Sequence, residues 1–349
     1  MASLTLDWRH CSLARLGAKH EMEAAAPMDF RQVYEQYQHD LQEIDNILGT
    51  SMESENALLA GSSRQLLAAG GKRIRPLFAL LCSELGKMSE KQSVHRLAAS
   101  VELVHMASLV HDDVIDDATV RRGHPTVRAQ YGNRPAMYTG DFLFARAIRL
   151  LSSLSNMSLH VEMSNAIVRM TEGEIDQIRD FYDLGQPLKK YLRRIERKTA
   201  LLISVSCSLG AVVGGAPAAA VKAARRFGYF TGMAFQVIDD ILDFSGTESL
   251  VGKPVGNDLW QGNITYPALY TAQCTAQGAQ LRNLVSPTMT RDDLNAAVAL
   301  VRESGALEQA NQLASRYLDK ALVILRGLDE SSTRRSLEVV ARFVNQRMF

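Results

Sequence analysis

The feature that most constrains the fold of this chain is a helical hydrophobic period that runs through most of its length and breaks mainly at prolines. Apolar residues recur at every third or fourth position, which places them on one face of an α-helix. A late example is formed by Ala306, Ala310, Leu313, Tyr317, Ala321 and Ile324. The prolines that fall at the starts of such segments or between them are Pro76, Pro125, Pro135, Pro187, Pro217, Pro254, Pro267 and Pro287. The pattern predicts an all-α protein.

Strands are not indicated, because few segments alternate between apolar and polar residues and end in Asn-Gly or Asp-Gly turns. Neither an internal repeat nor a Pro/Ser-rich linker divides the chain. Its 349 residues, 46% of them hydrophobic, are enough to bury a large core. We therefore expect one large helical bundle over residues 29–349, preceded by a flexible extension over residues 1–28.

Charge and cysteine usage exclude several classes of protein. The 39 Lys and Arg residues nearly balance the 38 Asp and Glu residues, so no general attraction for nucleic acid is expected. The four cysteines are widely spaced and contain no Cys-x-x-Cys pair, which argues against a disulfide scaffold or a zinc site. The uncharged stretch 199–221 is diluted by Ser, Gly and Pro, so it predicts a buried helix rather than a transmembrane span. We expect a cytoplasmic protein that can contact the membrane peripherally.

An acidic cluster in the first half of the chain points to metal binding. Asp112 and Asp116 are four residues apart and lie on one face of a helix, with Asp113 beside them. The apolar stretch 103–110 precedes them, so the carboxylates are expected to point into a cavity, where unpaired charge is costly. A cation offsets that cost, and Mg²⁺ is typically held by one or two carboxylates with water and substrate phosphate oxygens. A solvated acidic face is the other explanation for a single cluster.

A second cluster favours metal binding over a solvated acidic face. Asp239, Asp240 and Asp243 repeat the same spacing within an even more apolar helix. If the two helices face each other, they can hold several Mg²⁺ ions around one organic diphosphate and neutralise it as a leaving group. An EF-hand calcium loop is excluded, because the clusters are helical and lack alternating ligands.

Basic residues lie close to both clusters in sequence. Those of interest are Lys72, Arg75, Arg121, Arg122 and Lys253. Arginine offers several donors to phosphate and lysine offers a point charge, while the glycine pair just before Lys72 lets the backbone approach a ligand closely. The set supplies the positive charge that a diphosphate requires.

Together these motifs resemble the trans-isoprenyl diphosphate synthase (polyprenyl synthase) family, from about residue 30 to the C-terminus. The segments that carry the resemblance are residues 70–76, 112–123, 197–199 and 239–254. Residues 138–146 and 256–263 are most similar to component II of bacterial heptaprenyl diphosphate synthases. The resemblance implies the isoprenoid synthase fold, a helical bundle with a central cavity. It also implies Mg²⁺-dependent head-to-tail condensation of isopentenyl diphosphate onto an allylic diphosphate such as farnesyl diphosphate. The implied product is a long trans chain, heptaprenyl diphosphate for a quinone such as menaquinone.

The resemblance also assigns roles to individual residues. The implied metal ligands are Asp112, Asp113, Asp116, Asp239 and Asp243, with Asp240 and Asp258 in support. The residues expected to contact the allylic diphosphate are Arg121, Lys198 and Lys253. Those expected to hold isopentenyl diphosphate are Lys72, Arg75, His105 and Arg122. Thr199 and Gln236 are expected to stabilise the allylic cation. With no obvious dedicated base near both motifs, the released diphosphate is the expected proton acceptor.

Small residues just before the first cluster predict a long product. Ala107 and Ser108 precede Asp112 by five and four positions, so they are expected one turn below the metal site. A growing tail can pass small side chains, whereas an aromatic residue there would close the cavity. Ordinary close packing between helices is the alternative reason for small residues.

Other functions remain open from the sequence alone. A terpene cyclase fits the first cluster, although such enzymes usually carry an Asn/Ser/Glu pattern in place of the second. An HD-type metal phosphohydrolase is suggested by His111-Asp112, but the second cluster offers no histidine ligands. A non-catalytic regulatory subunit is a third alternative, although both Asp clusters are intact. The chain is expected to form either a homodimer or a heterodimer with a small component I-like subunit.

Overall fold

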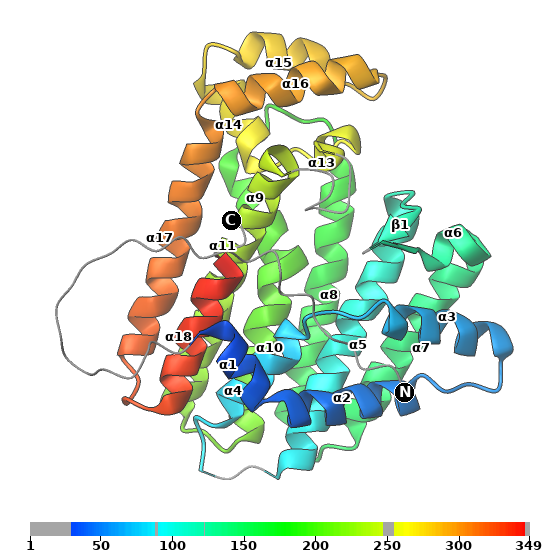
Figure 1. The fold of residues 1–349 in the computed structure, drawn as a ribbon, viewed down its shortest axis with the longest axis vertical. Helices are drawn as coiled ribbons and strands as arrows, with labels where there is room; N and C mark the ends of the chain where they lie inside the picture. Colours follow the sequence, from blue (N-terminus) through cyan, green and yellow to red (C-terminus); the bar gives the residue numbers. More distant parts are fainter. Residues whose placement is uncertain (1–28, 88–89, 122, 247–254, 346–349) are drawn as a thin grey trace.

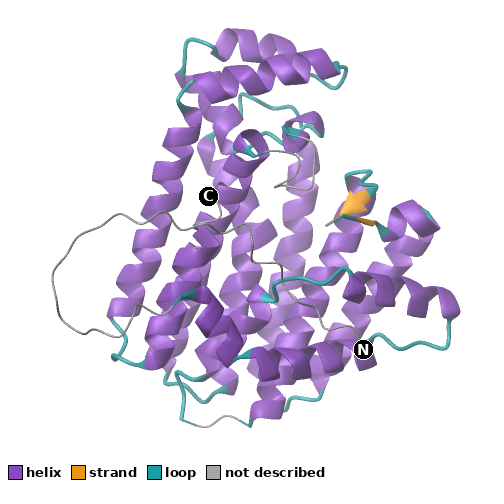
Figure 2. Cartoon of the chain, in the orientation of Figure 1, coloured by secondary structure: helices purple, strands orange, loops and turns teal. Residues whose placement is uncertain are grey.

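The computed structural model describes residues 29–87, 90–121, 123–246 and 255–345, and these fold almost entirely into α-helices (Figures 1 and 2). The all-α prediction is therefore confirmed. Strands in the described residues are limited to β1 (Val120–Arg121) and β2 (His124–Pro125), which pair antiparallel. The sequence does not indicate this hairpin, because two-residue strands leave no alternating pattern. The predicted extension over residues 1–28 lies outside the described residues.

The helices follow one another with short connections. In the first half they are α1 (Phe30–Gln36), α2 (Gln38–Ser51), α3 (Ala57–Ala68), α4 (Ile74–Ser83), α5 (Lys91–Ile115), α6 (Val127–Tyr131), α7 (Asn133–Ser152) and α8 (Met157–Arg179). The second half begins with α9 (Leu188–Ile195), a π-helical turn η1 (Glu196–Ala200), α10 (Leu201–Val213) and α11 (Ala218–Ser245). It continues with α13 (Asn257–Trp260), α14 (Tyr266–Cys274), α15 (Gly278–Leu284), α16 (Arg291–Glu303), α17 (Ala306–Arg326) and α18 (Ser332–Asn345).

Long helices form the body of the molecule. Helix α5 packs along α7, while α10 packs against both α4 and α11, and α17 runs beside α11 (Figure 1). Helices α14 to α16 lie at one end of the bundle, and α1 to α4 lie towards the other (Figure 1). The apolar stripe that the sequence predicts on α17 is confirmed as core, since Ala306, Ala310 and Ala321 are fully buried. Burial of such stripes is the main source of stability for amphipathic helices.

Capping side chains start several of the helices. Asp29 accepts a hydrogen bond from the backbone of Gln32 and so caps α1, and Thr290 caps α16 in the same reciprocal way with Asp293. Asn56 caps α3 through its side-chain oxygen. These caps satisfy backbone donors that a helix cannot pair internally.

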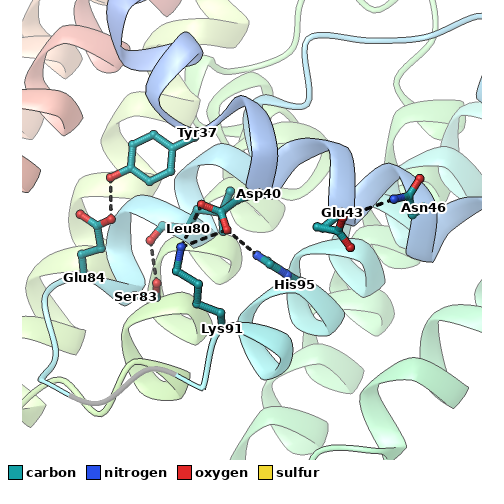
Figure 3. A network of polar contacts seen from close by, with 9 residues as sticks. All are labelled: Tyr37, Asp40, Glu43, Asn46, Leu80, Ser83, Glu84, Lys91 and His95. Carbon is teal, nitrogen blue, oxygen red and sulfur yellow. Dashed lines mark hydrogen bonds and ion pairs between the residues drawn. The ribbon is translucent and has the colours of Figure 1, made fainter.

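A polar network ties the first described helices to the bundle (Figure 3). Tyr37 donates a hydrogen bond to Glu84, the residue that directly follows α4 (2.7 Å), and Thr333 on α18 donates to the same carboxylate (2.8 Å). On α2, Asp40 lies 2.8 Å from the His95 ring on α5. Helices α1, α2 and α18 are thereby held together on one side of the molecule.

The structure also bears on the question of a membrane span. Most of the uncharged stretch forms α10, which ends at Val213 and is almost entirely buried. Within the described ranges, no helix combines the length and the apolar character needed to cross a bilayer.

Candidate functional site

The two Asp clusters lie at the C-terminal ends of the long helices α5 and α11 and are brought together by the segment that follows the second cluster. Gln261 donates a hydrogen bond from its side chain to the backbone carbonyl of Asp116 (3.1 Å). In the same segment, the amide of Asp258 approaches both carboxylate oxygens of Asp243 (3.3 and 3.4 Å). Clusters from opposite halves of the chain therefore border one site.

The six carboxylates of the two clusters fall into two groups by exposure. Asp113, Asp240 and Asp243 are buried, at 2, 2 and 7% exposure, whereas Asp112 and Asp116 are half-buried and Asp239 is exposed. Arg121 on β1 holds Asp113 through an ion pair of 2.8 Å, which accounts for the burial of that carboxylate. Asp239 is thus the one of the six that faces solvent, while Asp112, with a side chain 13% exposed, and Asp116 are only partly covered.

Lys198 lies between the first cluster and a carboxylate that the sequence does not single out. Its ammonium is 3.7 Å from Asp112 and 3.1 Å from Glu174 on α8. Burial lowers the pKa of Lys198, but the charges of Asp112 and Glu174 more than offset this, so the pKa is raised and the lysine stays charged. Burial raises the pKa of the Glu174 carboxyl, and the charge of Lys198 opposes that rise.

A hydrogen-bonded chain links η1 to the second cluster. Thr199 donates to the side-chain oxygen of Gln236, whose amide nitrogen donates to Asp240 (2.9 Å). The fully buried Tyr191 donates to the other oxygen of Asp240 (2.6 Å). Burial raises the pKa of Asp240 to about 8, the charge of Asp258 adds to the rise, and the two hydrogen bonds oppose it. The π-helical turn that presents Lys198 and Thr199 is a feature often found at functional sites.

The glycine-rich turn before α4 borders the same region. Gly70 and Arg73 both adopt left-handed backbone conformations, with φ of 65° and 48°. Arg73 is buried, and its guanidinium pairs with Asp45 (2.7 Å) and with Glu102 on α5 (3.1 Å). The turn is therefore held by Arg73, while Lys72 before it and Arg75 after it are more exposed.

A pocket joins this turn to the first cluster. Its lining includes Gly70, His105 on α5, Asp113 and Arg121. These groups come from separate parts of the chain, namely the turn, α5 and the β1–β2 hairpin. Of the residues that the sequence assigns to substrate binding, His105 and Arg121 thus lie together at this pocket. The turn contributes Gly70 and Arg73 to the lining, which does not include the assigned residues Lys72 and Arg75.

The side chains of His111 and Asp112 are not arranged as the metal ligands of an HD-type phosphohydrolase. Its ring nitrogen lies 3.1 Å from the carbonyl oxygen of Met137 and 3.5 Å from Asp141, both on α7. Gly140 makes this approach possible, since a Cβ there would lie 2.2 Å from the same ring nitrogen. Asp112, by contrast, pairs with Lys198. The adjacent His111 and Asp112 therefore point to different partners, which disfavours an HD-type metal site.

The two residues that we relate to chain length differ in their surroundings. Ala107 is completely buried, whereas Ser108 is half-buried and donates its hydroxyl to the carbonyl of His105 (2.8 Å). Both lie on α5 before Asp112, Ser108 by four positions and Ala107 by five. These separations correspond to about 6–8 Å along the helix axis. Two predicted phosphate-binding residues, Arg122 and Lys253, lie outside the described residues.

The donor set fits a magnesium ion shared with a substrate. In the part of the chain that the structure describes, no group of three or more His, Cys, Asp or Glu side chains forms a ready-made cage. Magnesium does not require one, because it keeps several water ligands and is commonly bound by one or two carboxylates plus phosphate oxygens. The half-buried pair Asp112 and Asp116 and the exposed Asp239 have this character.

Sequence reasoning missed three residues of the site: Glu174, Tyr191 and Gln261. Each acts on a partner far away in sequence, at separations of 24, 49 and 145 positions. Glu174 lies in an acidic stretch that reads as a solvated helix face, and Tyr191 has no local signal. Gln261 falls within the stretch 256–263 that carries part of the family resemblance, which is the only signal that points to it.

Comparisons with known proteins agree with this geometry. A family model described as polyprenyl synthetase matches residues 56–301. The heptaprenyl diphosphate synthase component 2 of Geobacillus stearothermophilus is 45% identical, over 92% of this chain and 99% of that protein. The heptaprenyl diphosphate synthase structure from Staphylococcus aureus has a TM-score of 0.85 at 33% identity, covering 92% of this chain and 99% of the other. A Caulobacter crescentus polyprenyl synthase, solved with calcium and isoprenyl diphosphate, has a TM-score of 0.87 at 32% identity, with 93% and 100% coverage.

Proposed function

The chain belongs to the polyprenyl synthetase family and is a trans-prenyltransferase, and from this premise we propose that it extends an allylic diphosphate by repeated head-to-tail condensation with isopentenyl diphosphate. The observation that carries the proposal is the convergence of the two Asp clusters and Lys198 on one site. A terpene cyclase is less well supported, because the second cluster is fully Asp-rich and a second basic region lies beside the first.

We assign direct metal contact to the more accessible carboxylates, Asp112, Asp116 and Asp239. Mg²⁺ bound there would neutralise the diphosphate leaving group and thereby lower the barrier to ionisation of the allylic substrate. Asp113 and Asp243, which the sequence also suggests as ligands, are held by Arg121 and by the Asp258 amide. We assign them a supporting role, because a carboxylate that is fixed by a protein donor helps to hold the ends of α5 and α11 in place.

The basic residues divide between two substrates. Lys198 lies within 4 Å of Asp112, and together with Arg121 and Lys253 we assign it to the allylic diphosphate. Lys72, Arg75, His105 and Arg122 are assigned to isopentenyl diphosphate, since the pocket beside the glycine-rich turn includes His105. The two diphosphates then lie on adjacent sides of the first cluster, which places the isopentenyl double bond next to the carbon that ionises.

The chain of Thr199, Gln236 and Asp240 lies where positive charge develops. The oxygens of Thr199 and Gln236 are fixed by their mutual hydrogen bond, so they need little reorganisation to stabilise an allylic cation. The cation alkylates the isopentenyl double bond to form a new C–C bond, and loss of one proton restores an allylic double bond. We assign that proton to the diphosphate released from the allylic substrate.

We further propose that the product is long, with heptaprenyl diphosphate for a quinone side chain as the specific candidate. Support comes from the relatives that are named heptaprenyl diphosphate synthases. Ala107 and Ser108 leave the face of α5 below Asp112 without a bulky side chain, so the growing tail can extend along it. We also expect the enzyme to act in the cytoplasm.

A partner polypeptide is suggested by an exposed apolar stripe on α8. Met157, Val161, Val168 and Ile175 are each at least half exposed, and their spacing of four and seven residues lines one side of the helix. Because the Geobacillus relative is named component 2 of its synthase, we propose that a small second subunit covers this stripe. Val168→Glu should abolish association with that subunit, as measured by size-exclusion chromatography with light scattering. A wild-type chain that forms only a dimer of itself would overturn the choice of partner.

The function is tested by incubating the purified chain with farnesyl diphosphate, isopentenyl diphosphate and Mg²⁺, with and without the candidate small subunit, and measuring product length. We expect long-chain products centred on seven isoprene units, and none without Mg²⁺. Asp112→Ala and Asp239→Ala serve as matched inactive variants. Absence of elongation under both conditions, or release of diphosphate without consumption of isopentenyl diphosphate, would contradict the proposal.

A further inference from the structure

An aromatic platform lies next to Lys72 and is built from the two ends of the described chain. Phe343 on α18 stacks on Phe30 of α1, with ring centroids 3.6 Å apart and planes only 5° from parallel. The ammonium nitrogen of Lys72 lies 5.3 Å from the centroid of the Phe343 ring. This distance is within the range over which a cation is attracted to the face of an aromatic ring.

Both sides of this contact are firmly anchored. Lys72 directly precedes Arg73, whose buried guanidinium is paired with Asp45 and Glu102. On the other side, Thr333 anchors the start of α18 to Glu84, and Phe30 is 6% exposed at the start of the capped helix α1. A lysine side chain has a long flexible stem, so fixing its head group reduces the entropy lost when it binds a ligand.

From this arrangement we infer that Phe343 is a positioning residue for the second substrate: its ring holds the Lys72 ammonium in place to receive the diphosphate of isopentenyl diphosphate. The inference rests on the proposed function, in which Lys72 contacts that substrate. It extends that function to α1 and α18, which lie outside residues 56–301 matched by the family model.

The test compares Phe343→Leu, which keeps an apolar side chain but removes the ring, with Phe343→Tyr, which keeps the ring. We measure the Kd of isopentenyl diphosphate by calorimetry, which needs no turnover, and the KM of each substrate separately. Phe343→Leu should weaken isopentenyl diphosphate binding about two- to fivefold. The KM of the allylic substrate and kcat should change less, and Phe343→Tyr should restore wild-type binding.

Two controls separate positioning from a general structural effect. Phe230→Leu removes the ring of another lysine contact, that with Lys320 on α17 (5.7 Å), and should leave binding unchanged. In a Lys72→Ala background, Phe343→Leu should have no further effect, because the ring then has no ammonium to hold.

The results distinguish the inference from the proposed function. Equal weakening of both substrates, an undiminished effect of Phe343→Leu in the Lys72→Ala background, or unchanged binding in Phe343→Leu would overturn the positioning role. The proposed function would survive those outcomes. A wild-type chain that binds no isopentenyl diphosphate would overturn both.

Discussion

Arg73→Met is predicted to lower the free energy of unfolding substantially. Arg73 lies in the basic segment assigned to substrate binding, but its side chain forms a buried ion pair with Glu102. The side chains of Arg73 and Glu102 are 4 and 5% exposed, and their ion pair measures 3.1 Å. Removing the guanidinium leaves the Glu102 carboxylate buried without that partner, which typically costs about 3–5 kcal/mol. The second pair, with Asp45, adds about 0–1 kcal/mol, because Asp45 is 45% exposed and solvent screens it. The left-handed backbone strain at residue 73 is the same for methionine and does not contribute to the difference.

The measurement is urea-induced unfolding followed by circular dichroism at neutral pH. Arg73→Met should lower the free energy of unfolding by roughly 3–5 kcal/mol. The double variant Arg73→Met/Glu102→Gln should recover part of the loss, because it also removes the buried charge. Arg31→Met is the matched control: its ion pair with Glu35 is as short, at 2.8 Å, but both side chains are more than half exposed, so little change is expected.

Two outcomes would refute this reasoning. If Arg73→Met were no more destabilising than Arg31→Met, the burial of the pair would not be what stabilises the turn. If the double variant were as unstable as the single one, the loss would come from packing of the arginine stem rather than from the stranded carboxylate.

Further predictions concern the metal, the product and the pH dependence of stability. Asp112→Asn and Asp239→Asn should each reduce turnover at least about a hundredfold, because charge that stabilises the transition state is lost. Helical content, measured by circular dichroism, should stay normal. Near-wild-type turnover in either variant would contradict the metal assignment. Ser108→Phe and Ala107→Tyr should each shorten the product, as measured by chromatography of the dephosphorylated chains. Unchanged lengths in both variants would remove the proposed tail path. Burial raises the pKa of the Glu174 carboxyl in the folded state. The protonated carboxyl therefore contributes its full stabilisation below the pKa of the unfolded chain, 4.5, and this stabilisation is lost as pH rises through the raised pKa of the folded protein. Glu174→Gln should therefore flatten the decline of the unfolding temperature above about pH 4.5, and an unchanged slope would refute this assignment.

The sequence predicted the helical architecture well because the relevant information is local. Each helix carries its own apolar stripe, and proline or a capping residue marks many of its ends. The β1–β2 hairpin escaped prediction because its strands are too short to show a period. The arrangement of the helices in space could not be predicted in this way, because it depends on how their apolar faces fit one another.

In the acidic clusters too, the sequence predicts the local spacing of the carboxylates, whereas the tertiary structure decides which of them are buried. The spacing of Asp112 and Asp116 places both on one helical face, and this follows from the helix period alone. Which carboxylates become buried depends on other segments: Arg121 from the hairpin covers Asp113, and the Asp258 amide meets Asp243. Neighbouring positions in one motif thus differ in exposure for reasons that the motif does not contain.

The sequence by itself therefore determined the fold class, the pair of Asp clusters and the family to which they point, because these depend on spacing within single helices and on motif identity. Only the tertiary structure decided that Arg73 is buried and paired with Glu102, that Glu174 shares Lys198 with Asp112, and that Phe343 lies beside Lys72. The physical reason is range: a side chain's charge environment is set by whatever packs within a few ångströms, and in a bundle those neighbours come from helices far apart in the sequence.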